Sequence, residues 1–262
     1  MNARRLAGAA APAALGLLAL AAWEAMVRLN DIPHYILPAP SLIAQSLIAD
    51  RAILLPALWV TLEITAMALA AAAGGGVLLA VLFAQSRWVE RSLFPYAVIL
   101  QVTPMVAIAP LILIYVESTW VALLLCAWIV AFFPILSNTA LGLRSVDRNL
   151  ADLFRLYGAS RWQTLRRLQL PGAMPYFLGG LRIAGGLSLI GAVVAEFAAG
   201  TAGSGSGLAY RILEAGYRLN IPRMFAALVL LSAAGIAIYV ALSLVQHYAL
   251  RRWHESALRR DS

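Results

Sequence analysis

Six long apolar stretches dominate the sequence. They run at about residues 6–27, 57–84, 93–116, 119–138, 176–200 and 224–246, and each has the roughly 20 residues that a helix needs to cross the hydrocarbon core of a bilayer. Only 12% of the 262 residues are charged and 62% are hydrophobic, whereas soluble domains carry about a quarter charged residues. The sequence therefore predicts an all-α integral membrane protein with six transmembrane helices, folded as one domain over residues 1–262.

The first apolar stretch also resembles a secretory signal peptide, because Arg4 and Arg5 precede an alanine-rich run. The apolar region of a signal peptide usually has about 7–15 residues. Here the run extends from Leu6 to Val27 with a single charge, Glu24. Its length favours an uncleaved first membrane helix.

Arginine supplies all 20 basic residues, and its distribution predicts the orientation of the chain. The segments between the spans alternate between the two sides of the membrane. Fourteen arginines lie in the segments of one side, which include both termini and residues 139–175. Five lie in the segments of the other side, and Arg182 is left unassigned. Cytoplasmic segments of membrane proteins are rich in Lys and Arg, so both termini are predicted to be cytoplasmic. The net charge of +8 does not indicate nucleic-acid binding, because the arginines alternate with apolar spans instead of gathering on one soluble face.

Residues that commonly bind metals or carry catalysis are sparse. Cys126 is the only cysteine, and His34, His247 and His254 do not cluster, so neither a metal site nor a catalytic residue is expected. External loops are predicted at 28–56 and 201–223. The second of these contains a Gly-Ser-Gly-Ser-Gly run at 203–207, which predicts a flexible turn and lacks the lysine of a phosphate-binding loop.

Residues 139–175 form the longest predicted cytoplasmic loop, and a helical pattern lies within it. Apolar residues recur at helical spacing, at Leu150, Leu153, Phe154, Leu156 and Tyr157. Gly158 is placed to end this short helix, Ser160 to cap a second one, and Pro171 to stop the second before the next span. An amphipathic helix in a basic loop can lie on an anionic lipid surface or dock into a groove of a soluble partner, and the periodicity fits both.

The same loop resembles the cytoplasmic signature of the binding-protein-dependent ABC importer permeases, which reads E-A-A, three residues, G, nine residues, I-x-L-P. The triplet Asp152-Leu153-Phe154 stands in the E-A-A place and Gly158 follows at the matching spacing. Leu168, Leu170 and Pro171 stand in the I-x-L-P place. The resemblance extends to the nitrate/sulfonate/taurine branch, which also handles pyrimidine-like precursors, through the elements at 37–41 and 191–197.

This resemblance implies a type I ABC importer permease in a bacterial inner membrane, working as a homodimer with two cytoplasmic ATPases and an external substrate-binding protein. The chain has no G-x-x-x-x-G-K-[ST] motif, so ATP and Mg²⁺ are expected on the ATPases and no cofactor on this chain. The implied solute is small and either anionic or heterocyclic. The implied ATPase-coupling residues are Asp152, Leu153, Phe154, Arg155, Tyr157, Gly158, Ala159, Ser160, Arg161, Leu168, Leu170 and Pro171.

Polar side chains within the predicted spans are candidates for a translocation path. A charge at bilayer depth costs at least about 2.5–3.5 kcal/mol, so Glu63 and Glu196 need a partner such as Arg182, or water. The alternative for the whole group is interhelical hydrogen bonding, and for Glu196 a place at the outer end of its span. Pro104 and Pro110 are predicted to break the third span. The path candidates are Glu63, Gln101, Thr103, Asn138, Ser188 and Glu196.

Two other functions are compatible with six spans. A self-sufficient secondary transporter would leave the cytoplasmic signature unexplained. A membrane-embedded enzyme would need several titratable residues at one depth, and the candidates Glu63 and Glu196 lie in separate spans.

Overall fold

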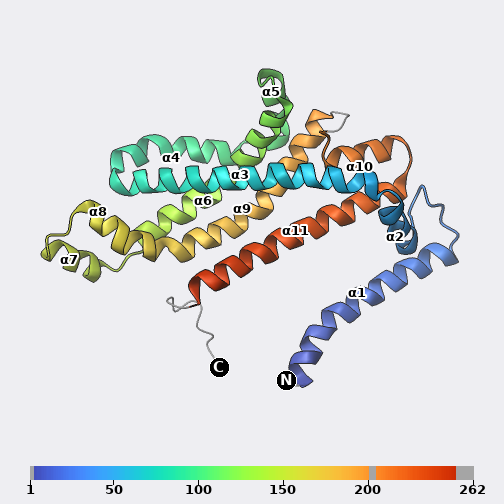
Figure 1. Ribbon diagram of the computed structural model, residues 1–262, viewed down its shortest axis with the longest axis horizontal. Helices are drawn as coiled ribbons and strands as arrows, with labels where there is room; N and C mark the ends of the chain where they lie inside the picture. Colours follow the sequence, from blue (N-terminus) through green and yellow to red (C-terminus); the bar gives the residue numbers. More distant parts are fainter. Residues whose placement is uncertain (1–2, 201–204, 252–262) are drawn as a thin grey trace.

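The computed structural model describes residues 3–200 and 205–251, with side chains from residue 11 onward, and these ranges form helices without a strand (Figure 1). Five helices are long and apolar enough to cross a membrane, or six when one bent pair is counted as a span. The five are α1 (Ala3–Leu29), α3 (Arg51–Gln85), α6 (Thr119–Arg144), α9 (Leu170–Ala199) and α11 (Ile221–Leu250). The bent pair is α4 (Arg87–Val102) and α5 (Met105–Tyr115).

Helices α3, α6 and α9 form the centre of the molecule, and small residues allow their backbones to approach closely. Gly191 on α9 faces α6, where a Cβ in its place would lie 2.9 Å from the Cα of Ala127. The buried cluster around this contact is mostly alanine, with Ile64 and Leu123 as its larger members. Close backbone packing of this kind is the usual basis of helix association in a membrane.

The third span is broken as predicted at Pro104 but not at Pro110. Helices α4 and α5 meet at 102°, because Pro104 lacks an N–H and holds the preceding Thr103 in an extended conformation (ψ 125°). The hydroxyl of Thr103 donates to the carbonyl of Ile99 at 2.6 Å. Pro110 lies within α5, which continues to Tyr115, so the break predicted at Pro110 is wrong.

Pro171 does not stop a helix, contrary to the prediction. Helix α8 (Arg161–Thr164) continues through a π-helical segment, η1 (Leu165–Gln169), into α9. The wider turn pairs the N–H of Leu170 with the carbonyl of Leu165, five residues earlier. Pro171 follows directly as the second residue of α9, and the helix continues through it. The predicted loop at 139–175 is therefore largely helical.

The predicted loop at 28–56 is also partly helical, since it contains α2 (Pro40–Ala49) and the start of α3. A carboxylate from α1 fixes the start of α2. Glu24 accepts hydrogen bonds from the Ser41 N–H at 3.0 Å and the Ser41 hydroxyl at 2.7 Å, which supplies the cap that α2 lacks within its own sequence. At the other end of α2, Asp50 pairs with Arg223 of α11 at 2.6 Å.

The loop predicted at 201–223 contains α10 (Leu208–Tyr217), which packs on α11, α9 and α3 at the same end of the molecule as α2 (Figure 1). On α10 the Arg211 guanidinium donates to Glu214 at 2.8 Å, which holds the pKa of that carboxyl below its usual range. Part of the glycine–serine run, residues 203 and 204, lies outside the described residues, as do His254 and the arginines at 252, 259 and 260.

Helices α1 and α11 expose apolar side chains along most of their length. Only 6% of the most apolar stretch of each helix is buried within the chain. On α1, Leu15, Leu17 and Leu18 are about two-thirds exposed. Apolar surface on this scale is expected to contact lipid or another protein.

Candidate functional site

The predicted short helix within the loop is present as α7 (Arg148–Leu156). It lies with α8 at the end of the molecule opposite α2 and α10 (Figure 1). The Asp147 carboxylate caps its first turn by accepting the N–H of Asn149 at 2.7 Å. An acceptor at this position satisfies one of the unpaired N–H groups of a helix start, so the local sequence specifies where α7 begins.

Gly158 ends α7 with a left-handed residue, as predicted. Its φ is +68°, and two backbone hydrogen bonds close the turn: the Ala159 N–H donates to Phe154 at 2.9 Å, and the Gly158 N–H donates to Arg155 at 2.9 Å. This is the Schellman arrangement, in which glycine is favoured because it has no Cβ to clash. The turn fixes the direction in which the chain leaves α7.

None of the side chains of α7 is buried within the chain. Leu156 and the following Tyr157 are 85% and 83% exposed, and Leu153 is 44% exposed. Asp152 and Arg155 form an exposed ion pair at 3.1 Å, and Phe154 is half-buried. The predicted apolar face is therefore present, and no other part of the described chain covers it.

Ser160 begins α8 through a reciprocal capping box, as predicted. The Gln163 N–H donates to the Ser160 hydroxyl at 3.2 Å, and the Ser160 N–H donates to the Gln163 side-chain oxygen at 2.7 Å. Ala159 is half-buried and Arg161 is exposed. Leu168, Leu170 and Pro171 are half-buried where η1 joins α9.

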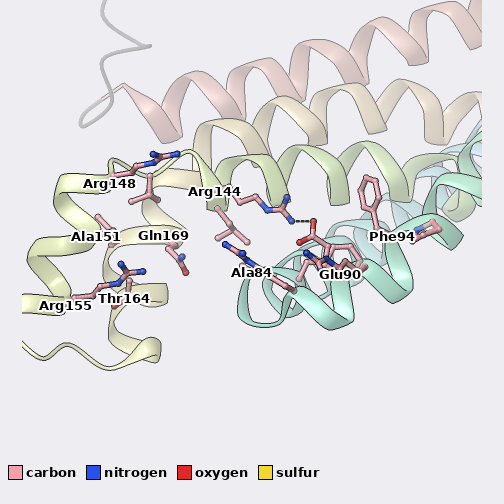
Figure 2. Close-up of a pocket in the computed structure, with 16 residues that line it drawn as sticks. Ala84, Glu90, Phe94, Arg144, Arg148, Ala151, Arg155, Thr164 and Gln169 are labelled. Carbon is pink, nitrogen blue, oxygen red and sulfur yellow. Dashed lines mark hydrogen bonds and ion pairs between the residues drawn. The ribbon is translucent and has the colours of Figure 1, made fainter.

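A groove of about 870 Å³ separates α7 from the neighbouring ends of α4 and α6 (Figure 2). Its arginines come from all three helices, and we call it the arginine groove. The guanidinium of Arg144 pairs with Glu90. The arginines that line it are Arg87, Arg91, Arg144, Arg148 and Arg155.

Glu196 is buried near the end of α9, with 2% of the residue exposed. One carboxylate oxygen accepts the hydroxyl of Thr61 on α3 at 2.8 Å, and the other accepts the N–H of Ala209 on α10 at 2.9 Å. The Thr61 oxygen in turn accepts the N–H of Leu208 at 2.8 Å. The first two N–H groups of α10 are therefore satisfied by side chains from two spans.

Gly207 makes room for this carboxylate. The carboxylate lies against the Gly207 backbone, and a Cβ added to Gly207 would overlap it. Glu196 is therefore at the end of its span, as one alternative held, but it is enclosed rather than solvated. Arg182 is not its partner: the Arg182 guanidinium lies 5.7 Å from the ring centroid of Tyr239.

The other path candidates fall into two groups. Glu63 and Gln101 are exposed on the surface of the chain, and neither makes a hydrogen bond to another described residue. Asn138 and Ser188 instead donate to backbone carbonyls, at 2.7 Å to Pro134 and at 2.9 Å to Thr65. Thr103, partly exposed at the break between α4 and α5, belongs to this second group, because its hydroxyl donates to the carbonyl of Ile99.

Sequence reasoning missed Thr61, Gly207 and the role of Glu24. Neither glycine nor threonine is unusual in a membrane helix or its loops, so their residue types carried no signal. A carboxylate in an apolar span was the available signal, and it identified Glu196 without identifying its partners.

Residues 72–259 match the family described as the binding-protein-dependent transport system inner membrane component. The chain belongs to this family. The matched region contains α7, the arginine groove and Glu196, and it begins within α3 after Thr61.

Two relatives extend the similarity over nearly the whole chain. The riboflavin transport system permease protein RibX of Chloroflexus aurantiacus is 36% identical, with 92% of this chain and 88% of that protein aligned. The formylaminopyrimidine transport permease protein ThiX of Halalkalibacterium halodurans is 31% identical, with 91% and 94% aligned. Both are permeases, and both alignments extend into the part of the chain before residue 72, which the family match leaves out.

The fold also has solved counterparts. The MetNI methionine ABC transporter in an inward-facing conformation matches with a TM-score of 0.64 at 20% identity, over 77% of this chain and 98% of that one. This confirms the type I importer permease fold. The chain is the multi-pass membrane permease of an ABC importer for a small solute, and it belongs to a family of transport subunits.

Proposed function

We propose that this chain, as one permease domain over residues 1–262, forms a homodimer in a bacterial inner membrane and is driven by two cytoplasmic ATPases that dock on α7. ATP and Mg²⁺ would bind the ATPases and not this chain, and an external binding protein would deliver the solute. The observation that supports this most directly is the largely exposed apolar face of α7, which lies between a capped start and a glycine-closed end. An amphipathic helix of this kind docks into a groove on its partner.

The direction of the outer helices supports two cytoplasmic termini. α1 runs toward the α2 and α10 end, and α11 runs away from it (Figure 1), so both ends of the chain would lie on the side of α7. A phosphatase reporter that is active only outside the cytoplasm, fused after Ser262, should therefore be inactive. The same reporter inserted after Asn220, between α10 and α11, is the positive control. Activity at the first site would show that the orientation is reversed.

We propose that the path runs between the two copies and that Glu63 and Gln101 face it, because both side chains are exposed on the single chain and a charge in a span is expected to face water or protein. Ser188 and Glu196 would hold α9 against α3, since their hydrogen bonds join the two helices. Asn138 and Thr103 bond to carbonyls of their own helices and would shape the path locally.

The solute we propose is a small heterocycle of the flavin or pyrimidine type. The support is the similarity to RibX and ThiX, whose names state riboflavin and formylaminopyrimidine as solutes, over nine-tenths of this chain. The alternative solute, which the sequence resemblance also implies, is a small anion such as a sulfonate.

Reconstituted transport distinguishes these solutes. Proteoliposomes are prepared with the permease and its ATPase in the membrane, the ATPase facing the lumen, and the binding protein outside. They should take up labelled riboflavin or formylaminopyrimidine when the lumen contains ATP. An excess of unlabelled heterocycle should compete, and nitrate or taurine should not. Uptake that nitrate or taurine abolishes would contradict the heterocycle assignment, and uptake without ATP would contradict the ATPase-driven mechanism.

A further inference from the structure

The arginine groove has more positive charge than its acidic neighbours can balance. Glu90 pairs with Arg144, and Asp152 pairs with Arg155. The remaining three, Arg87, Arg91 and Arg148, have no acidic partner among the residues that the structure describes. A cluster of unbalanced guanidinium groups around a cavity attracts an anion, and the planar guanidinium matches two oxygens of a phosphate.

The groove lies where apolar spans give way to charged segments, which is the depth of lipid headgroups. α3 ends at Gln85 after a long apolar run. The next helix, α4, carries Trp88, which is 77% exposed, and exposed tryptophan is typical of the membrane interface. The charged part of the groove is therefore at a level that a phospholipid phosphate can reach.

Apolar surface continues from the groove along α4. Phe94 and Pro95 line the groove, and Leu93, Tyr96 and Ile99 are exposed farther along the helix by 43%, 66% and 56%. A ligand that fits both parts has a negative head and a long apolar tail. A free phosphate would use only the arginines, and an acidic protein segment would leave the apolar part uncovered.

We propose that the arginine groove binds the phosphate of an anionic phospholipid of the surrounding leaflet. Basic pockets between membrane helices on the cytoplasmic side are suited to anionic headgroups. The proposal is independent of which solute is transported. It also leaves the docking face of α7 free.

The two faces of α7 would then have different tasks. Arg148, Ala151 and Arg155 line the groove and recur at helical spacing on one face, whereas Leu150, Leu153 and Tyr157 fall on the opposite face. A phosphate held between Arg148 of α7 and Arg91 of α4 would connect α7 to the membrane-spanning helices. Since α7 has no buried residue of its own, such a lipid would fix the position of α7 through the face that lines the groove, opposite its docking face.

Native mass spectrometry of the purified full-length protein tests the proposal. Binding of phosphatidylglycerol is compared with binding of phosphatidylcholine, for the wild type and for the double variant Arg91→Gln/Arg148→Gln. The matched control, Arg166→Gln/Arg251→Gln, removes two exposed arginines from the same side of the chain outside the groove. Each variant is first checked for wild-type elution in size-exclusion chromatography.

The wild type should prefer phosphatidylglycerol, and the groove variant should bind it about 10- to 30-fold more weakly, because each arginine contributes about 1 kcal/mol of attraction and 1.4 kcal/mol corresponds to tenfold. The control should change little. If the double variant does not elute normally, the test rests on the lipid preference of the wild type and on the single variant Arg87→Gln, which should also bind phosphatidylglycerol more weakly.

Four outcomes would overturn the proposal. The wild type could show no preference between the two lipids, or the control could lose as much binding as the groove variant. Millimolar inorganic phosphate could displace the lipid, which would identify a small-anion site. The groove variant could keep its lipid affinity and lose co-purification with the ATPase, which would identify an acidic protein partner instead.

Discussion

Replacing Gly158 with valine is expected to lower ATP-driven uptake by at least about tenfold while the membrane spans still form. The φ of Gly158 is +68°, a conformation that costs an ordinary residue roughly 1–2 kcal/mol and a β-branched residue more. A cost of 1.4 kcal/mol corresponds to tenfold. Because α7 has no buried side chain to resist fraying, its last turn should open and its apolar face should no longer match the ATPase. Uptake and ATPase stimulation in proteoliposomes measure this loss.

Gly158→Asn is the matched control. No atom lies within 4 Å of the position that a Cβ on Gly158 would take, so neither substitution creates a steric clash. Asparagine adopts the left-handed conformation far more readily than valine, and this variant should retain most of the uptake. Wild-type transport by Gly158→Val would show that the turn is not needed for coupling. Equal loss of uptake in both variants would show that the presence of a side chain at position 158 causes the loss, and not the cost of the left-handed backbone conformation.

Replacing Glu196 with leucine should destabilise the protein by about 2–5 kcal/mol. The substitution keeps the bulk of the side chain but removes the acceptor of the Ala209 N–H and leaves the Thr61 hydroxyl only the carbonyl of Ala57, at 3.3 Å. An unsatisfied buried group costs about 1–3 kcal/mol, and more where a charged partner is lost. In a protein of this size that corresponds to a fall in Tm of roughly 5–15 °C. Thermal unfolding of the purified protein in detergent measures it.

Glu63→Leu provides the comparison, because Glu63 is a carboxylate in a span that is exposed and makes no hydrogen bond to the described residues. It should leave the Tm nearly unchanged. Gly207→Val should reproduce the loss caused by Glu196→Leu, since its side chain would overlap the carboxylate, whereas Gly205→Val should not, since nothing lies within 4 Å there. An unchanged Tm together with abolished uptake in Glu196→Leu would instead assign Glu196 to the path.

The end of α7 and the start of α8 could be predicted because the interactions that define them are local. The left-handed turn at Gly158 closes through carbonyls at Phe154 and Arg155, and the capping box at Ser160 involves only Gln163. Each depends on residues within one or two helical turns, so the sequence alone contains the information. The coupling role of these residues stays a prediction until transport is measured.

Proline positions were predicted less well because the effect of a proline depends on its neighbours. Pro104 bends the chain by 102° since Thr103 before it leaves the helix. Pro171 does not end a helix, because the π-helical turn of η1 comes before it and places it in the first turn of α9. The local rule for proline is the same in both cases, and the surrounding backbone decides the outcome.

The sequence by itself determined the membrane environment, the approximate positions of the spans and the family signature, since these depend on composition and on short spacings. Only the tertiary structure decided what Glu196 does. Its partner Thr61 lies 135 residues away along the chain, and α10 begins where the two side chains meet. A buried carboxylate must be satisfied, but the sequence does not identify the donor when packing of distant helices brings it into place.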